Sequence, residues 1–114
     1  MTLIEKHRLQ SSLKEWCEQN GAELEHDTDN PLGERFEVRW TKDDPTLIRF
    51  IDVYPEGANR ITIQKGVFDK AHCSEDVRAK GTIYYRTVDQ VGEALSQLKP
   101  FTDRMSRAHL REPL

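Results

Sequence analysis

Cysteine is scarce in this sequence, and its placement excludes the commonest cysteine-based sites. Only two cysteines occur among 114 residues, Cys17 in a helix-like segment and Cys73 in a polar one. Neither their number nor their spacing is typical of a disulfide framework or a zinc site. We therefore expect reduced thiols, no metal and no cofactor.

Long hydrophobic runs are also missing. A membrane-spanning helix needs ~20 consecutive, largely apolar residues, whereas the 36% of hydrophobic residues in this chain are scattered along it. The first residues lack the basic stretch, apolar stretch and small-residue cleavage site of a secretory leader. These absences predict a cytoplasmic protein that does not contact a membrane.

Charge is plentiful and unevenly distributed. Charged residues make up 32% of the chain, which leaves enough apolar material for one thin, two-layer domain. The net charge of -3 combines residues 1–76, with 16 acids and 10 bases, and residues 77–114, with 4 acids and 7 bases. A small core with a large charged surface favours a homodimer, and this polarity would help to orient it.

A capping box predicts a helix near the start of the chain. Thr2 and Glu5 have the spacing at which each side chain satisfies a free backbone N–H of the first helical turn. An apolar stripe follows at helical spacing, and Gly21 supplies the conformational freedom that a helix end often uses. We expect this helix over residues 3–19.

The same signature recurs near the other end. Thr87 and Gln90 form a second capping box, and an apolar stripe again follows it. Because proline lacks the backbone N–H of a helix interior, Pro100 is expected to terminate this second helix.

The middle of the chain alternates apolar and polar residues, as antiparallel strands joined by short turns do. Strands are expected at residues 22–26, 35–41, 46–54, 60–67 and 80–87. The third of these is apolar at both parities, which predicts a strand covered on both faces. In the last, Ile83 and Tyr85 are expected on the core side, and Tyr84 and Arg86 on the opposite side.

These patterns together predict an α+β fold. We expect an antiparallel β-meander of four or five strands, flanked by an N-terminal and a C-terminal helix that pack on one face of it. Residues 1–100 form a single domain in this interpretation. Residues 101–114 form a basic C-terminal tail, either a short helix or mobile. No motif identifies a known family.

Arginines dominate the sheet face that the helices are expected to leave open. This face and the tail supply the candidate partner-binding residues, which are Arg35, Arg39, Arg60, Tyr84, Arg86, Arg104 and Arg107. Arginine forms bidentate bonds to carboxylates, and arginines with an aromatic on an open sheet can also hold single-stranded nucleic acid. Glu37 lies among them, so cross-strand pairing is the alternative explanation of the pattern.

Two further clusters contain residue types that carry chemistry. His26 with Asp27, Asp29 and Asn30 offers oxygen and nitrogen ligands for a cation, but lacks the ordered spacing of a calcium loop and is typical of a turn. A second cluster combines a base, a thiol and two acids, in His72, Cys73, Glu75 and Asp76. Adjacent side chains rarely face one another, and nothing nearby favours a thiolate. We therefore assign no catalytic and no metal-binding residue.

The function expected from these features is that of a small, non-enzymatic protein-binding or regulatory module, a homodimer that acts on a larger partner. A single-stranded nucleic-acid-binding domain that uses the arginine and tyrosine face is the alternative. The acidic net charge and the lack of a lysine-rich stripe weigh against it. A small enzyme with a pocket that the sequence does not announce is the second alternative.

Overall fold

The computed structural model describes residues 1–29, 33–41, 47–69 and 84–103. Its elements follow in the order α1 (Leu3–Asn20), β1 (Glu23–Asp27), β2 (Arg35–Trp40), β3 (Leu47–Pro55), β4 (Arg60–Asp69), β5 (Tyr84–Thr87), the 3-10 helix η2 (Val88–Gln90) and α2 (Val91–Asp103). The α+β fold expected from the sequence is confirmed.

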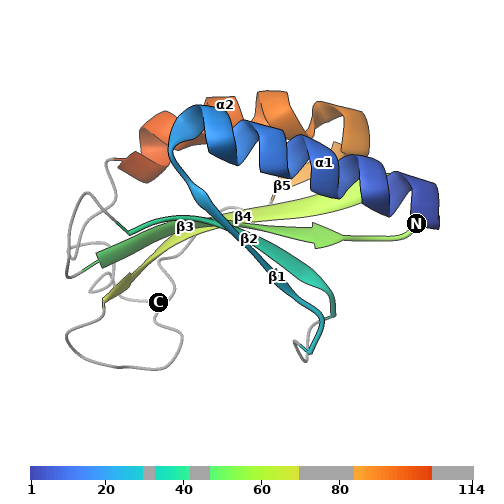
Figure 1. Ribbon diagram of the computed structural model, residues 1–114, viewed down its shortest axis with the longest axis horizontal. Helices are drawn as coiled ribbons and strands as arrows, with labels where there is room; N and C mark the ends of the chain where they lie inside the picture. The colour runs from blue at the N-terminus through green and yellow to red at the C-terminus, as the bar shows by residue number, and fades with distance from the viewer. Residues whose placement is uncertain (30–32, 42–46, 70–83, 104–114) are drawn as a thin grey trace.

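The molecule has two layers. Five strands, counted within the described residues, form one antiparallel sheet in which each strand pairs with its neighbour in sequence, from β1 at one edge to β5 at the other. Both helices lie on the same side of this sheet (Figure 1). The sheet is therefore the predicted meander, with one face covered by helices and the polar residues of β1 and β2 on the opposite face.

Helix α1 begins and ends where its capping residues predict. The backbone N–H of Glu5 donates to Thr2 Oγ1 at 3.1 Å, and Gly21 closes the helix with a φ of 65°. A left-handed φ is accessible to glycine without steric cost, so the chain can turn sharply into β1. Neither helix of the described ranges is long and apolar enough to cross a membrane.

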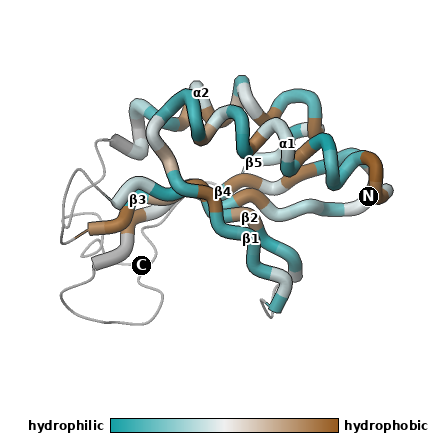
Figure 2. The backbone as a smooth tube through the Cα atoms, in the orientation of Figure 1, coloured by the Kyte–Doolittle hydropathy of each residue, from teal (hydrophilic) through white to brown (hydrophobic). Residues whose placement is uncertain are grey.

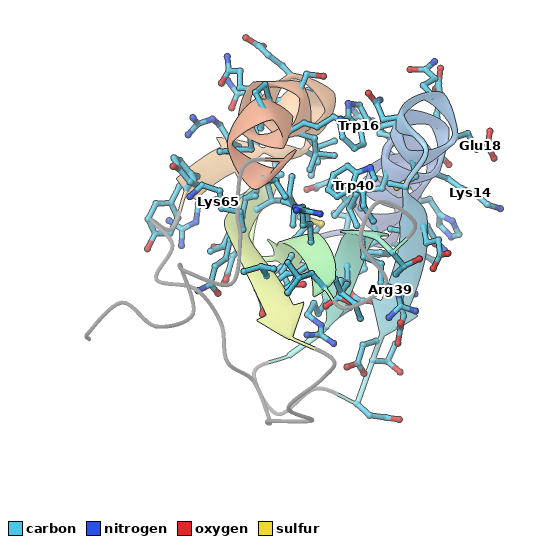
Figure 3. All side chains as sticks on the ribbon, turned by 90° about the vertical axis from the view of Figure 1, so that its left-hand side faces the viewer. Lys14, Trp16, Glu18, Arg39, Trp40 and Lys65 are labelled. Carbon is cyan, nitrogen blue, oxygen red and sulfur yellow. The ribbon has the colours of Figure 1, made fainter. Side chains whose placement is uncertain are left out.

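The core lies between the helices and the sheet. Trp16 of α1 and Trp40 of β2 meet edge to face, with ring centroids 5.9 Å apart, and both point into the space between the layers (Figure 3). Trp16 Nε1 donates to Ser96 Oγ of α2 at 2.9 Å, and Trp40 Nε1 donates to the carbonyl of Asn20 at 3.1 Å. Each indole thus buries its ring and satisfies its N–H, tying both helices and the sheet together.

Strand β3 is buried on both faces, as its apolar residues at both parities predict. Ile51 and Val53 face the helices and are fully buried, while Phe50 and Asp52 face the other way and are 5% and 0% exposed. The Phe50 ring lies over Gly66, the residue opposite it on β4. Close packing therefore continues beyond the helix-covered face.

Helix α2 corrects one expectation. It runs through Pro100 and ends at Asp103, three residues later than predicted. The reason lies in the last turn, where Thr102 is fully buried and its hydroxyl donates to the carbonyl of Leu98 at 3.0 Å. The burial and hydrogen bond of Thr102 offset the loss of stability caused by the missing backbone hydrogen bond of Pro100. Residues 101–103 of the predicted tail thus belong to α2, and residues 104–114 lie outside the described ranges.

The contact between Phe50 and Gly66 yields a stability prediction. A Cβ built on Gly66 would lie 2.4 Å from Phe50 Cζ, so Gly66→Ala should force the ring to move and lower the free energy of unfolding by ~1–3 kcal/mol. Urea denaturation followed by circular dichroism measures this loss.

The control for this prediction is Gly92→Ala in α2. A Cβ on Gly92 meets no atom within 4 Å, so this change should be neutral or add up to ~1 kcal/mol through helix propensity. In a double-mutant cycle, Phe50→Leu should cost less stability in the Gly66→Ala background than in the wild type. Additive losses would contradict the proposed steric contact.

Candidate functional site

The open face of the sheet holds three of the seven predicted partner-binding residues. The strand registers place Arg35, Arg39 and Arg60 on the side away from the helices. Arg39 projects from the sheet on that side (Figure 3). Arg104 and Arg107 lie outside the described residues.

Tyr84 and Arg86 lie on the opposite side from the one expected. They pair with Ile63 and Ile61, both fully buried residues of the helix-covered face, and Tyr84 packs against the core. Tyr85 instead faces away from the helices and is 60% exposed. Two consecutive tyrosines fit either parity, because a tyrosine has an apolar ring and a polar tip. The pairing with β4 therefore decides which one is buried.

Arg35 is surrounded by carboxylates from three strands. Its guanidinium lies 3.3 Å from Asp27 on β1, 3.5 Å from Glu37 on β2 and 3.9 Å from Asp52 on β3. Tyr54 Oη also donates to Asp52, at 3.5 Å. The arginine thus forms the centre of a cross-strand network rather than a free cationic group.

Arg39, four residues further along β2, has a similar environment. Its guanidinium lies 2.7 Å from Glu25, 3.7 Å from Glu23 and 3.6 Å from Glu37. Together, five carboxylates and two arginines of the described chain form what we call the open-face network, comprising Glu23, Glu25, Asp27, Arg35, Glu37, Arg39 and Asp52. With every group ionised the network is acidic, and the β1–β2 hairpin that carries most of it is largely hydrophilic (Figure 2).

Glu37 occupies the most unfavourable position for a charge in this network. Burial raises its pKa to about 7, and the charge of Asp52, its direct cross-strand partner, adds to that effect. Arg35 and Arg39 act in the opposite direction but do not cancel it. The Glu37 carboxyl therefore takes up a proton near neutral pH.

A different environment surrounds Arg60 and Arg86. Both line a hollow of about 350 Å³ at the β5 edge of the sheet, which we call the edge cleft. Its residues are Ala58, Asn59, Arg60, Tyr85, Arg86, Thr87 and Gln90. The β3–β4 turn and the start of η2 thus bring together two arginines that project from opposite faces of the sheet.

Aromatic rings hold these two arginines in place. The Arg60 guanidinium lies 5.8 Å from the centroid of the Tyr85 ring, and that of Arg86 lies 5.9 Å from the centroid of Tyr84. Arg86 Nη1 also donates to the Tyr85 carbonyl at 2.7 Å. No carboxylate within the described ranges forms an ion pair with either arginine, so their charge remains uncompensated there.

The sequence analysis missed several members of the edge cleft. Asn59 lies between the strands expected at residues 46–54 and 60–67, and Thr87 and Gln90 indicated only a helix start, where the Thr87 N–H does donate to Gln90 Oε1 at 3.0 Å. A usable signal was present, because a turn and a capping box that flank paired strands must lie close together. The sequence alone did not show whether Tyr84 or Tyr85 faces the cleft.

The described part of the other candidate clusters shows only the contacts of a turn and an ion pair. His26 Nε2 lies 2.7 Å from Glu34 Oε2, and Asp27 Oδ1 accepts from the Asp29 N–H at 2.9 Å, as in a turn. No group of three or more potential metal ligands occurs among the described residues. Burial raises the pKa of the Cys17 thiol to about 11, with Glu18 adding to it. Asn30 and the cluster of His72, Cys73, Glu75 and Asp76 lie outside the described ranges.

Comparison with known proteins gives no information on the function of this arrangement. No family model, no curated protein and no solved structure matches the chain. The function must therefore be argued from the surfaces themselves.

The Glu37 environment predicts a pH-dependent stability. Because its pKa is raised from the ordinary 4.5 to about 7 in the folded protein, the stabilising effect of its protonation is fully present below about pH 4.5 and is lost as the pH rises through about 7. Glu37→Gln keeps a neutral side chain at every pH. The variant should therefore gain roughly 1 kcal/mol relative to the wild type between pH 5 and pH 8, a value reduced by solvent screening.

Urea denaturation of both proteins at the two pH values measures this difference. Glu18→Gln, on the exposed outer side of α1 (Figure 3), removes the same charge outside the open-face network and serves as the control. If Glu37→Gln and the wild type differ by the same amount at both pH values, the proposed proton uptake by Glu37 is wrong.

Proposed function

We propose that this protein is a small, non-enzymatic binding module that holds an acidic segment of a larger partner protein in the edge cleft. The observation that carries the proposal is the convergence of Arg60 and Arg86, which have no ion-pair partner among the described residues, on one hollow beside the exposed Tyr85. A carboxylate in this hollow would supply the missing counter-charge.

The chemistry of arginine favours a carboxylate. The guanidinium presents its N–H groups in a planar fork that matches both oxygens of the group, and charge-assisted bonds of this kind are worth ~1.5–3 kcal/mol each. The rings of Tyr85 and Tyr84 pack against Arg60 and Arg86. This packing limits the side-chain freedom that binding would otherwise remove.

Arg35 and Arg39 are weaker candidates for the same role. A partner's carboxylate would have to displace those of the open-face network, which lie as close as 2.7 Å to Arg39. We therefore assign partner contact to Arg60 and Arg86, with Tyr85 in place of Tyr84. Arg104 and Arg107 of the basic tail remain part of the proposal on sequence grounds alone.

Single-stranded nucleic acid is the second candidate ligand. The observation in its favour is the exposed Tyr85 ring with the Arg60 guanidinium 5.8 Å from its centroid, a pair able to stack a base and contact a phosphate. The acidic open-face network shares the sheet surface with Tyr85 and would repel a longer phosphate backbone. Protein is therefore the better-supported partner.

We further propose that the module acts as a cytoplasmic homodimer with a regulatory role. Leu3 and Ile4 in the first turn of α1 are 71% and 73% exposed. These adjacent apolar side chains would be covered by a second copy of the chain in the proposed dimer. The free, buried thiol of Cys17 fits a reducing compartment.

The binding proposal predicts the behaviour of charge-reversed variants. A fluorescein-labelled hexaglutamate peptide should bind to the wild type, and Arg60→Glu should weaken its affinity at least tenfold because it replaces an attractive charge by a repulsive one. Arg86→Gln should weaken it severalfold. Fluorescence polarisation at low and moderate salt measures both effects.

Lys14→Glu is the matched control. Lys14 points outward from α1, away from the edge cleft (Figure 3), so its reversal should change the affinity no more than twofold. Equal losses in Lys14→Glu and Arg60→Glu would reveal a general charge effect and defeat the proposal. Stronger binding of a labelled oligo(dT) than of hexaglutamate would favour the nucleic-acid candidate instead.

The homodimer has its own prediction. Light scattering at high protein concentration should give a mass near twice the 13.3 kDa of one chain, and the double variant Leu3→Ser, Ile4→Ser should shift it toward one chain. Both side chains are exposed, so the fold should tolerate these changes. A wild-type mass that stays near 13.3 kDa rules out stable self-association.

A further inference from the structure

The edge cleft continues along helix α2. A second hollow of about 140 Å³ adjoins it, lined by Arg86, Gln90, Glu93, Ala94 and Gln97. The two hollows share Arg86 and Gln90. They are therefore neighbours, and we call the two hollows together the β5–α2 groove, which extends from the β3–β4 turn to the exposed side of α2.

The charges of this groove differ between its two ends. Arg60 lines only the edge cleft, Arg86 lines both hollows, and Glu93 lines only the hollow beside α2. Glu93 accepts a bond from Gln97 Nε2 at 3.4 Å, but it forms no ion pair with any residue that the structure describes. The groove thus has a cation at the Arg60 end, an anion at the Glu93 end and the Arg86 cation where the two hollows meet.

The length of the groove suits a short extended peptide. Gln90, Glu93 and Gln97 follow η2 and α2 at intervals of three and four residues, so at ~1.5 Å per residue they extend over roughly 10 Å. An extended chain rises ~3.3 Å per residue, and alternate side chains point the same way. Three or four peptide residues therefore span the hollow beside α2. Arg86 and Glu93 both line this hollow, so ligand side chains two residues apart, at ~7 Å, can contact one each.

Addition of a peptide strand to the edge of β5 is the competing mode of binding. Two backbone groups at this edge already form hydrogen bonds with side chains of the protein. The carbonyl of Tyr85 already accepts from Arg86 Nη1 at 2.7 Å, and the N–H of Thr87 already donates to Gln90 Oε1 at 3.0 Å. A backbone that pairs with β5 would have to break the Thr87 bond and share the Tyr85 carbonyl with Arg86. Recognition in this groove therefore depends on ligand side chains.

We propose that the ligand of the β5–α2 groove is an extended peptide segment of mixed charge, with an acidic side chain at Arg60 and Arg86 and a basic side chain two residues away at Glu93. This inference rests on the proposed function, because it names the kind of segment that the edge cleft binds. It adds a second contact that a purely acidic ligand cannot make.

Two synthetic peptides that differ at one position test the inference. In the sequence Gly-Gly-Glu-Ser-Lys-Gly-Gly the lysine can reach Glu93, and replacing it by glutamine removes that contact. We expect the wild type to bind the lysine peptide about two- to fivefold more tightly, the range of one exposed ion pair. NMR titration of the labelled protein measures both affinities, and the amide signals of Glu93 and Gln97 should shift with the lysine peptide.

Glu93→Gln should abolish the preference for lysine, while Glu18→Gln, the same change on the outer side of α1, should retain it. If Arg60→Glu weakens both peptides but Glu93→Gln leaves the lysine preference intact, the mixed-charge inference is overturned and the acidic-segment proposal stands. If neither peptide binds the wild type, or Arg60→Glu changes neither affinity, the proposed function fails, and the inference fails with it.

Discussion

The register of β3 between its two neighbours is the constraint on which the rest of the structure depends. Pairing Val38 with Ile51 and Phe36 with Val53 turns these four apolar residues toward the helices. The same pairing sets Glu37 opposite Asp52 on the other face. Because a slip of one residue would send every side chain to the wrong side of the sheet, burial of the core also enforces the contact between these two carboxylates.

That contact explains why the arginines of β2 are not free to act as a binding surface. Carboxylates from β1, β2 and β3 lie within 4 Å of Arg35 or Arg39, and these two cations offset the repulsion between the carboxylates. Removing Arg35 would weaken the compensation of the buried carboxylates Glu37 and Asp52, which costs more than the ion pairs themselves contribute. The open-face network is thus a requirement of the fold, whereas the edge cleft carries positive charge that the described fold does not use.

Most of the fold could be predicted from the sequence, because capping boxes and alternation are local signals. Thr2 and Gly21 mark the ends of α1, and the apolar residues of β3 indicate burial on both faces. The misplacement of Tyr84 and the extension of α2 past Pro100 share one cause, which is that long-range contacts outweighed a local rule. The edge cleft could not be predicted in full, since it depends on Arg60 and Arg86 meeting around the sheet edge from opposite faces.

The two edges of the sheet also bear on how this chain behaves before any partner is present. Exposed strand edges can template the stacking of identical chains into fibrils. At β5 the side chains of Arg86 and Gln90 occupy backbone groups that a neighbouring copy would need, and at β1 the carboxylates of Glu23, Glu25 and Asp27 would repel an identical strand laid beside them. A newly made chain is therefore protected from aggregation at each edge by a different means, hydrogen bonding by its own side chains at β5 and charge repulsion at β1.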